Sequence, residues 1–367
     1  MARMKTGKTE VKSAGPADVA ERAGCSVFTV QRVYNRPHTV SVKTRDLILA
    51  AANELGYTPN VLGRALRTGK VSTAALVMLA RRTSHLLGDT FTAFYETLTS
   101  GGYDLTLSII PEHAAPIEWI SKLVRSGRCG GLAIHLERLS PQALLELQRL
   151  NVPIVLLYTQ LQKKESSRKV HSVGFDNKAG LRQAVMHLIG LGHHRIAYFG
   201  GTPGWPDTHA RELGFRSALQ AAGMKPREPW IVPCDFKQFE RSAFTAFEKV
   251  LSGGRSKPPT AIVCASDKLA RATIEAARRH DLSVPQDISV TGFDDDDWSA
   301  YHVPPLTTVA FPRQNIAESA AQMLMHQFAG NSAPVRNLVL PTTLIVRDST
   351  AAPAGTRRIV STTRTPG

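Results

Sequence analysis

The sequence predicts a small α-helical unit followed by a large α/β core that contains two doubly wound parallel-sheet subdomains. Residues 16–56 place apolar positions at helical spacing between cap residues. From Ser72 onward, short apolar runs alternate with helical patterns, which is typical of parallel sheets covered on both faces. The alternation restarts after the charged segment 161–169, so this segment is a predicted subdomain boundary. At 367 residues, the chain is long enough for more than one core.

The net charge of +15 is unevenly distributed and indicates a polyanionic partner. Residues 1–70 hold 12 Lys or Arg and 5 Asp or Glu, so 7 of the 15 net charges lie in about a fifth of the chain. A basic surface can also serve solubility alone. Nucleic acid is the simplest partner for such an excess.

The four cysteines, Cys25, Cys129, Cys234 and Cys264, lie far apart in the sequence. Because no pair has metal-ligand spacing, they predict neither a metal site nor a disulfide framework. The first residues, MARMKTGKTEVK, lack the apolar run of a signal peptide, and no stretch of about 20 apolar residues could span a membrane. We therefore expect a cytoplasmic protein with no cofactor and no membrane partner.

Residues 16–35, PADVAERAGCSVFTVQRVYN, predict two short helices joined by a tight turn. Gly24 suits a left-handed helix end, and Ser26 is placed to cap the second helix. The apolar positions that can face one another are Val19, Ala20, Ala23, Val30 and Val33. The opposite face of the second helix carries Val27, Phe28, Gln31 and Arg32. Such a face suits a DNA major groove, although a generic helical hairpin would show the same spacing.

Ser41 is predicted to cap a third helix that Gly56 ends. Its apolar positions are expected to close the small core, and they are Val42, Leu47, Ile48, Ala51, Ala52 and Leu55. The segment VLGRALRTGK (61–70) is predicted to form a further short helix and a polar link.

The core is predicted to contain eight buried strands and eight helices before its last segment, LVLPTTLIVRDS (338–349). The strands are TAALVML (73–79), YDLTLSII (103–110), GGLAIHL (130–136), VPIVLLY (152–158), RIAYFGG (195–201), WIVPC (230–234), TAIVCAS (260–266) and ISVTGFD (288–294). The helices span 89–101, 116–126, 140–150, 177–191, 209–222, 239–252, 267–280 and 315–329. Tandem subdomains of this kind commonly bind a small ligand in the cleft between them.

Five segments, in this order, resemble the lactose-repressor (LacI/GalR) family of bacterial transcription regulators. They are DVAERAGCSVFTVQRVYN (18–35), VSVKTRDLILAAANELGYTPN (40–60), VGFDNKAGLRQAVMHLIGLGHHRIAYFGG (173–201), VPQDISVTGFDDDD (284–297) and VPPLTTV (303–309). The resemblance covers residues 16 to about 350. It depends on several independent motifs, which a lone pair of helices would not provide.

The resemblance implies a DNA-binding helix-turn-helix headpiece (1–60), a hinge helix and linker (61–71), and an effector-binding and dimerisation core (72–350). The core would resemble type I periplasmic sugar-binding proteins. Its N-subdomain would span about 72–172 plus 310–330, and its C-subdomain about 173–309 plus 331–350. Residues 351–367 would form a basic, disordered tail.

Members of this family bind near-palindromic operators as homodimers or tetramers and respond to a small molecule, often a sugar or its derivative. The resemblance thus implies double-stranded operator DNA and a small-molecule effector as partners. The chain shows no obvious leucine-heptad tail, which favours a dimer. Family habit favours a repressor.

Position matching places Val27 and Phe28 where the family reads base edges, with Arg32 one turn further on. Val27 and Phe28 depart from the polar residues often found there, and they can pack on thymine methyl groups. Arg32 can donate to guanine, or alternatively to a phosphate. The residues matched to backbone contacts are Ser26, Thr29, Gln31, Asn35, Tyr57 and Asn60. In the hinge, Leu66 matches the leucine that family members insert into the minor groove, and Gly63 allows close approach.

Arg211 and Asp294 match the arginine and the aspartate with which the family holds its ligand, while Asp295, Asp296 and Asp297 are expected to be loop and cap residues. Four consecutive carboxylates rarely converge on one ion, so no metal site is expected. Ser266 is a candidate to face the ligand, and Asp267 is expected to cap its helix. Tyr158 stands where the family often has aspartate, which argues against a plain hexose and indicates either stacking on the ligand or a different ligand. Trp205, Arg81 and His85 are further candidates. Arg81, Arg82 and Arg211 together indicate an acidic ligand such as a sugar acid or sugar phosphate. His193 and His194 are expected to be structural.

Two other functions are compatible with such a core, namely a solute-binding protein and a sugar-acting enzyme. The glycine-rich segment GGTPGW (200–205) lacks the Lys-Ser/Thr of a phosphate-binding loop, and no dinucleotide fingerprint follows the first strand. A solute-binding protein would need an export signal and no headpiece. The first 70 residues therefore favour a regulator over both.

Overall fold

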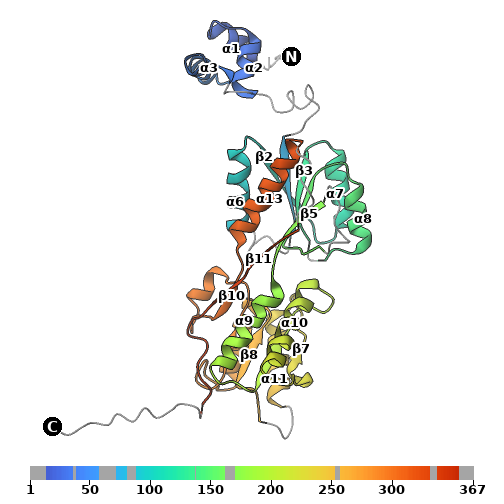
Figure 1. The fold of residues 1–367 in the computed structure, drawn as a ribbon, viewed down its shortest axis with the longest axis vertical. Helices are drawn as coiled ribbons and strands as arrows, with labels where there is room; N and C mark the ends of the chain where they lie inside the picture. Colours follow the sequence, from blue (N-terminus) through green and yellow to red (C-terminus); the bar gives the residue numbers. More distant parts are fainter. Residues whose placement is uncertain are drawn as a thin grey trace, which may run out of the picture. The chain divides into compact units, whose positions relative to one another are not determined.

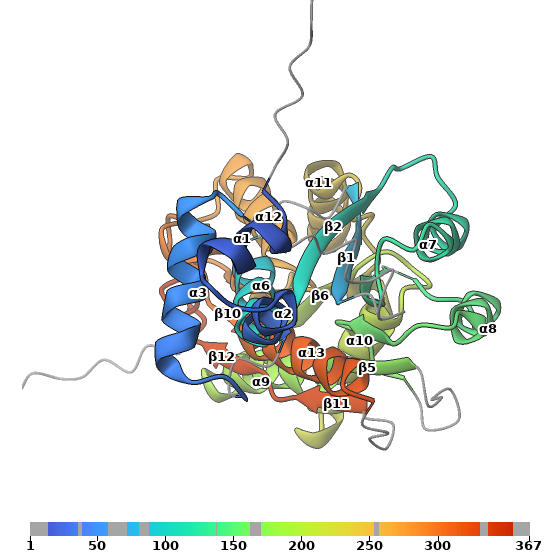
Figure 2. The ribbon, with the colours of Figure 1, turned by 90° about the horizontal axis from the view of Figure 1, so that it is seen from above.

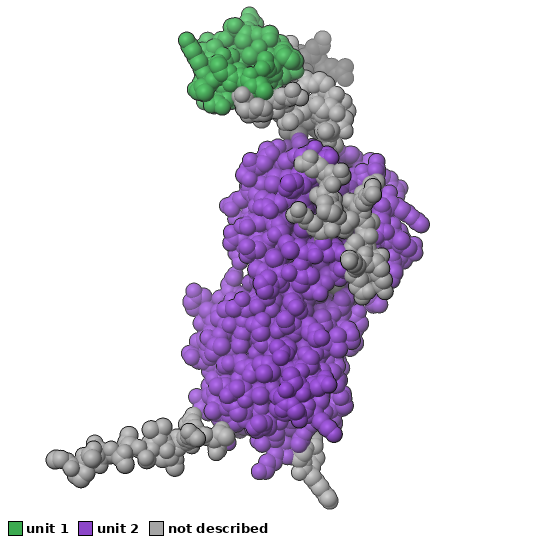
Figure 3. All heavy atoms as spheres, in the orientation of Figure 1, with its two compact units in different colours: residues 1–70 green, residues 71–367 purple. Residues whose placement is uncertain are grey.

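The computed structural model describes residues 14–35, 39–57, 72–80, 88–136, 138–161, 170–252, 257–330 and 337–354. The chain divides into two compact units, residues 1–70 and residues 71–367 (Figure 3). The expected hinge helix and linker, 61–71, lie outside the described residues.

The N-terminal unit contains three helices, α1 (Pro16–Arg22), α2 (Val27–Asn35) and α3 (Val42–Glu54). The turn between α1 and α2 is as predicted, because Gly24 has a φ of 62° and Ser26 Oγ accepts from the amide of Thr29 at 3.1 Å. Ser41 Oγ likewise caps α3 by accepting from the amide of Thr44 at 3.2 Å. The buried core is formed by Val19, Ala20, Ala23, Val30, Val33, Ile48, Ala51 and Ala52. The predicted packing of α1 against α2 is therefore confirmed.

Two residues expected in this core are instead exposed on α3. Val42 is 62% exposed and Leu47 is 55% exposed. The buried stripe of α3 follows Ile48, Ala51 and Ala52, which lie on one side at i, i+3 and i+4. Val42 lies off this stripe and Leu47 lies at its edge, and both side chains stay largely exposed, so the prediction that they close the core is wrong.

The first subdomain of the core is a six-stranded parallel sheet with the strand order β11-β5-β4-β3-β1-β2. Its strands are β1 (Thr73–Leu79), β2 (Asp104–Ile110), β3 (Gly131–His135), β4 (Ile154–Leu157), β5 (Val170–Phe175) and β11 (Asn337–Leu340). Its helices are α6 (Asp89–Ser100), α7 (Pro116–Arg125), α8 (Pro141–Arg149) and α13 (Arg313–Phe328).

Side chains alternate between the two faces of this sheet, and each face has its own helices. Along β1, Leu76 and Met78 share a core cluster with residues of α6 and α13. Ala75 and Val77 share another with Ile120 of α7 and Leu144 of α8. Figure 2 shows α7 and α8 on the side of the sheet away from α13. Both faces are thus covered, which explains why the strands are continuous apolar runs.

The second subdomain, which carries the labels β7 and β8 in Figure 1, is built on a four-stranded parallel sheet. Its strand order is β7-β6-β8-β9. Its strands are β6 (Ile196–Phe199), β7 (Ile231–Val232), β8 (Ala261–Cys264) and β9 (Ser289–Thr291). Its helices are α9 (Asn177–Gly190), α10 (Pro206–Ala221), α11 (Phe239–Leu251) and α12 (Asp267–Arg279), with the 3₁₀ turns η4 (Glu228–Trp230) and η5 (Asp297–Ala300). The antiparallel pair β10 (Thr308–Ala310) and β12 (Thr343–Ile345) lies beside α9.

The chain crosses between the subdomains three times, after β5, after β10 and after β11. Strand β5 pairs with β4 in the first sheet, so the first subdomain continues to Phe175 and the boundary predicted at 161–169 is wrong. Strand β5 was missed because polar residues such as His171 and Ser172 interrupt its apolar run. Strand β11 pairs with β5 in the first sheet. The prediction that residues 331–350 belong entirely to the C-subdomain is therefore wrong for this strand.

The last described residues belong to the fold. Ala351 is held on both sides, because its amide donates to Ser289 Oγ at 3.0 Å and its carbonyl oxygen contacts His193 Nε2 at 2.8 Å. The disordered tail was expected to begin at residue 351. Because Ala351 is part of the fold, the predicted start of the tail is at least one residue too early. His193 is buried and structural, as predicted. Within the described residues, no helix is long and apolar enough to cross a bilayer.

Candidate effector site and DNA-facing helix

A cavity of about 490 Å³ opens between the two subdomains, where their strands end. Its aromatic lining consists of Tyr158, Phe175, Trp205, Phe236, Phe239 and Phe311. Its charged lining consists of Glu112, Asp207, Asp294, Asp296, Arg211, Lys237, Lys268 and Arg313. The described lining therefore carries four carboxylates and four basic groups. This volume lies within the roughly 300–1,000 Å³ of small-molecule pockets.

Arg211, on α10, is buried and lines the cavity. Its Nε donates to Asn177 Oδ1 at 2.7 Å, and its Nη1 donates to the carbonyl oxygen of Ala265. Its Nη2 lies 3.5 Å from Asp294 Oδ1, and its guanidinium carbon lies 3.7 Å from the centre of the Phe293 ring. Three elements thus fix the guanidinium in one plane, so that it can orient a ligand with little loss of side-chain entropy.

Asp294 lies in a turn whose backbone is in an uncommon conformation. The φ of Asp294 is 125° and that of Asp295 is 52°, although neither residue is glycine. Such a conformation costs about 1–3 kcal/mol per residue unless surrounding contacts stabilise it. The three carboxylates of this turn diverge toward different arginines: Asp294 toward Arg211, Asp295 toward Arg347 at 2.7 Å, and Asp296 toward Arg313 at 3.7 Å. Because they diverge, they do not form one ion site.

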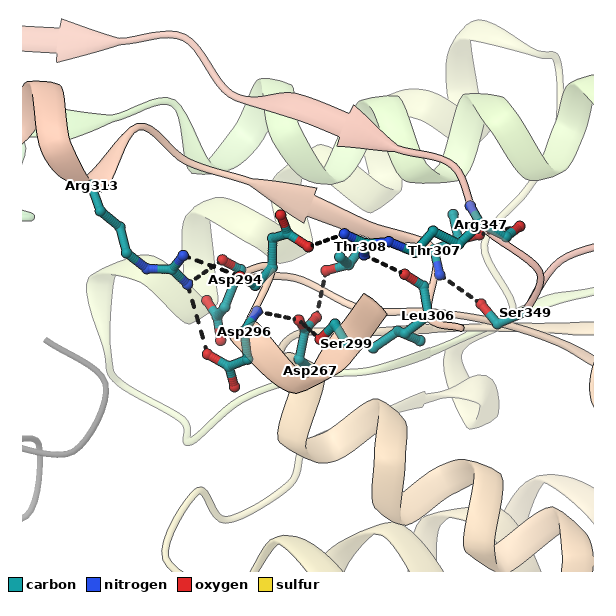
Figure 4. Close-up of polar contacts among 11 residues, drawn as sticks. Asp267, Asp294, Asp296, Ser299, Leu306, Thr307, Thr308, Arg313, Arg347 and Ser349 are labelled. Atoms are coloured by element: carbon teal, nitrogen blue, oxygen red, sulfur yellow. Dashed lines mark hydrogen bonds and ion pairs between the residues drawn. The ribbon is translucent and has the colours of Figure 1, made fainter. Parts of the chain in front are cut away.

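Asp267 is fully buried behind this turn and has a different role from the one predicted. Its carboxylate accepts from the amide of Asp296 at 2.9 Å, from Ser299 Oγ at 2.6 Å, and from Thr308 Oγ1 (Figure 4). The cap of α12 is Ser266, whose hydroxyl accepts from the amide of Leu269 at 3.3 Å. The prediction that Asp267 caps its helix is therefore wrong. Burial, with the negative charge of Asp294 nearby, raises the pKa of Asp267 to about 7, although its three donors act in the opposite direction.

Tyr158 lines the cavity from the side of the first subdomain. It directly follows β4, has a φ of 57°, and forms a hydrogen bond between its hydroxyl and Thr90 Oγ1. Its ring meets those of His135 and Phe311 edge to face at 5.2 and 5.7 Å. Burial raises the pKa of Tyr158 to about 12, so the phenol stays neutral at physiological pH. Tyr158 thus presents an aromatic surface at the position where the family often has an aspartate.

The structure brings five of the seven predicted effector residues to one cavity, namely Arg211, Asp294, Tyr158, Ser266 and Trp205. The other two, Arg81 and His85, lie outside the described residues, as does Arg82. The argument for an acidic ligand loses support. Arg211 already has three acceptors near it, and the described lining carries as many acids as bases.

Sequence reasoning missed the aromatic wall formed by Phe236 and Phe239, and also Arg313 and Thr208. Phe236 lies 5.9 Å from Trp205, ring centre to ring centre, and stacks on Phe239 at 5.2 Å. Thr208 Oγ1 is buried at the cavity and has no hydrogen-bond partner among the described residues. For Thr208, the sequence did contain a signal. Asp207 and Thr208 precede Arg211 by four and three residues in the first turn of α10, and this spacing puts them on the same face of the helix as Arg211.

In the headpiece, the free face of α2 is exposed as predicted. Phe28 is 69% exposed and Val27 is 37% exposed, so Phe28 is not part of the headpiece core. Arg32 Nη2 donates to the carbonyl oxygen of Thr39 at 2.6 Å, which ties α2 to the start of the next segment. A guanidinium has five N–H donors, so this bond leaves others for DNA. Tyr57 packs on the headpiece core, with its ring 6.0 Å from that of Tyr34.

The remaining predicted DNA contacts divide into two groups. Ser26, Thr29 and Gln31 lie at or within α2 and reach the surface at least in part. Asn60, Gly63 and Leu66, and the side chain of Asn35, lie outside the described residues.

The comparison with known proteins agrees with this architecture. Residues 17–60 match the family model of bacterial regulatory proteins of the lacI family, and residues 185–350 match a periplasmic binding protein-like domain. The HTH-type transcriptional repressor CytR of Escherichia coli (strain K12) is 30% identical over 349 residues, covering 95% of this chain and 99% of that protein. This chain belongs to the LacI family of bacterial regulatory proteins. As a transcriptional repressor of the LacI family, it is a DNA-binding protein and not an enzyme.

Solved structures support the same assignment for both units of this LacI-family repressor. The transcriptional regulator CelR–cellobiose complex has 30% identity and a TM-score of 0.68, covering 92% of this chain and 99% of that one. The lac repressor dimer bound to operator and the anti-inducer ONPF has 27% identity and a TM-score of 0.76, covering 93% and 100%. The headpiece and the two-subdomain core predicted from the sequence are therefore confirmed.

Proposed function

We propose that this repressor binds a near-palindromic operator as a homodimer in the bacterial cytoplasm, and that an uncharged sugar or glycoside in the cavity controls this binding. The observation that carries the effector assignment is the fixed Arg211–Asp294 pair facing an aromatic wall. Planar donors and carboxylate acceptors suit the hydroxyl groups of a sugar, while aromatic rings suit its apolar ring faces.

The charge of the cavity favours a neutral ligand over a sugar acid or a sugar phosphate. Its described lining balances four carboxylates with four basic groups, and the guanidinium of Arg211 already contacts Asp294. An added anion would compete with that carboxylate. Thr208 Oγ1, buried without a partner among the described residues, is a further hydroxyl that a polar ligand would satisfy.

A thermal-shift screen of mono- and disaccharides, with matched sugar acids and sugar phosphates, tests the effector class. The screen should include cellobiose, because the similar regulator CelR has been solved in complex with this sugar. A ligand at 100 times its Kd stabilises the folded state by about 2.7 kcal/mol, which raises the Tm of a core of this size by several degrees. We expect uncharged sugars to produce such a shift. A shift only with acids or phosphates would overturn the assignment.

We further propose that α2 lies in the major groove with Phe28 against a thymine methyl group, and that Arg32 contacts a base. Leu66 would wedge into the minor groove between the two headpieces, as family members do. The support is the exposure of Phe28 on a helix whose opposite face is buried. Dimerisation would place two such helices in successive major grooves.

Replacing Phe28 by alanine is expected to weaken binding to DNA selected by the wild-type protein from a random library. A lost base contact costs about 1–3 kcal/mol, which corresponds to roughly 5- to 150-fold in Kd. Because Phe28 is 69% exposed, the Tm of the headpiece should not fall. Fluorescence anisotropy of the labelled DNA measures the effect. Leu47→Ala, an equally apolar exposed position on α3, is the matched control and should bind as wild type; equal losses in the two variants would exclude the groove contact.

A further inference from the structure

The aspartate turn, defined as Asp294–Asp296, supplies two carboxylates to the cavity and is held from three directions. Arg211 approaches from α10 and Arg347 from the chain after β12, both in the second subdomain. Arg313 is the first residue of α13, a helix of the first subdomain. The turn is thus a place where both subdomains meet the cavity through a single short segment.

Arg313 differs from the other two arginines in what it binds. Its Nη1 donates to the carbonyl oxygen of Asp295 at 3.1 Å, and its Nη2 donates to the carbonyl oxygen of Asp294. Within the turn, these are the two residues whose φ was described above as positive. Arg347, in contrast, reaches the turn through the Asp295 carboxylate, and Arg211 through the Asp294 carboxylate. Arg313 therefore contacts the main chain of the turn at the residues whose backbone needs support.

The guanidinium of Arg313 is itself held in place. Its side chain is 14% exposed, and it lies 3.7 Å from Asp296 Oδ1 (Figure 4). Its guanidinium carbon is 4.7 Å from the centre of the Phe311 ring. A planar fork with two carbonyl acceptors and one carboxylate beside it has little freedom to rotate. A movement of the turn would accordingly be passed to the start of α13.

We propose that Arg313 is a positioning residue that keeps the aspartate turn in its left-handed conformation and links it mechanically to α13. Its two carbonyl bonds place the carboxylates of Asp294 and Asp296 toward the cavity. An effector that contacts these carboxylates thereby acts on a helix of the other subdomain. This last step rests on the proposed effector function, whereas the role of Arg313 in the turn does not.

Hydrogen–deuterium exchange on the full chain, without DNA or sugar, tests the proposal. Within the turn, the amide of Asp294 donates to the carbonyl oxygen of Val309 at 2.9 Å and that of Asp296 to Asp267 Oδ2 at 2.9 Å. In Arg313→Met and in Arg313→Lys, we expect both amides to exchange faster by about tenfold or more, since the lost bonds involve a charged donor. The amides in the first turn of α13 should also exchange faster, while β6 and β8 remain protected.

The two substitutions separate the clamp from simpler roles. Methionine keeps the aliphatic bulk against Phe311, and lysine keeps the positive charge beside Asp296. Wild-type exchange in Arg313→Met would show that packing alone matters, and wild-type exchange in Arg313→Lys would show that charge alone matters. Either result would overturn the proposal. Arg279→Met, which removes an exposed arginine paired with Glu275 on α12, is the matched control and should leave the turn unchanged.

The exchange experiment tests two claims, namely that Arg313 holds the aspartate turn and that it links the turn to α13. Both are tested independently of the effector proposal. Faster exchange in the turn without any change in α13 would overturn the link to that helix. A failed sugar screen would contradict the effector proposal but would leave the exchange result intact, because the experiment contains no ligand.

Discussion

Replacing Arg211 by methionine is expected to abolish the thermal shift that an uncharged sugar produces in the wild-type protein. The substitution removes the fixed donors of the cavity and leaves Asn177, Asp294 and the carbonyl of Ala265 without this partner. It should also lower the free energy of unfolding by about 3 kcal/mol, since breaking a buried, hydrogen-bonded charge pair leaves polar groups unsatisfied. Urea unfolding measures the stability, and thermal shift measures the response.

Arg216→Met on the same helix is the control for this prediction. Arg216 pairs with Glu212 and Glu228 at the surface, and exposed pairs contribute at most about 1 kcal/mol. The Arg216 variant should therefore keep both its stability and its sugar response. An Arg211→Met protein that folds and still responds to the sugar as wild type does would exclude Arg211 from the effector site.

Replacing Asp267 is expected to have the largest effect on stability. In Asp267→Ala, the amide of Asp296 and the hydroxyls of Ser299 and Thr308 lose their buried acceptor. We expect a loss of about 3–5 kcal/mol in the free energy of unfolding. Asp287→Ala, which removes an exposed carboxylate that accepts from the amide of Ser283, should cost far less and serves as the control.

The pH dependence of stability gives an independent test of the same carboxyl. The pKa of Asp267 is about 7 in the folded protein, whereas the pKa of an aspartate in an unfolded chain is about 3.9. Between these values the unfolded chain releases the proton that the folded protein keeps. The stability contributed by this group therefore falls as pH rises, by up to about 1.4 kcal/mol per pH unit.

In Asp267→Asn, this fall should disappear. The free energy of unfolding of wild type minus that of the variant should decrease from pH 5 to pH 7 and then level off. Urea unfolding at a series of pH values measures the difference. A difference that does not change with pH would show that Asp267 has an ordinary pKa in the folded protein.

Local chemistry made much of this fold predictable. Apolar runs located most strands, and cap residues such as Ser26 and Ser41 located helix starts. The errors have tertiary causes. Strand β5 contains polar residues that other segments cover, and Val42 and Leu47 needed the packing of three helices to be assigned to the surface. The boundary of the subdomains depends on which sheet β11 joins, and strand pairing over more than 160 residues leaves no local signal.

The effector site was predictable in part for the same reason. Arg211 and Asp294 follow motif positions, and the structure brings them together. Phe236, Phe239 and Arg313 lie on loops or helix starts, and only the assembled subdomains bring them to the cavity. Likewise, the role of Asp267 could not be seen from its place after a strand, where both a cap and a buried acceptor are compatible with the sequence.

The central claim is that a sugar in this cavity controls DNA binding, and the most direct test is the Kd for wild-type-selected DNA with and without the sugar. The uncharged sugar that most stabilises the wild-type core should change this Kd by about 5- to 150-fold, the usual range of allosteric coupling. Anisotropy of the labelled DNA at constant ionic strength measures it, because salt alone alters such affinities. A sugar that raises the Tm of the core but leaves the DNA Kd unchanged would contradict the account.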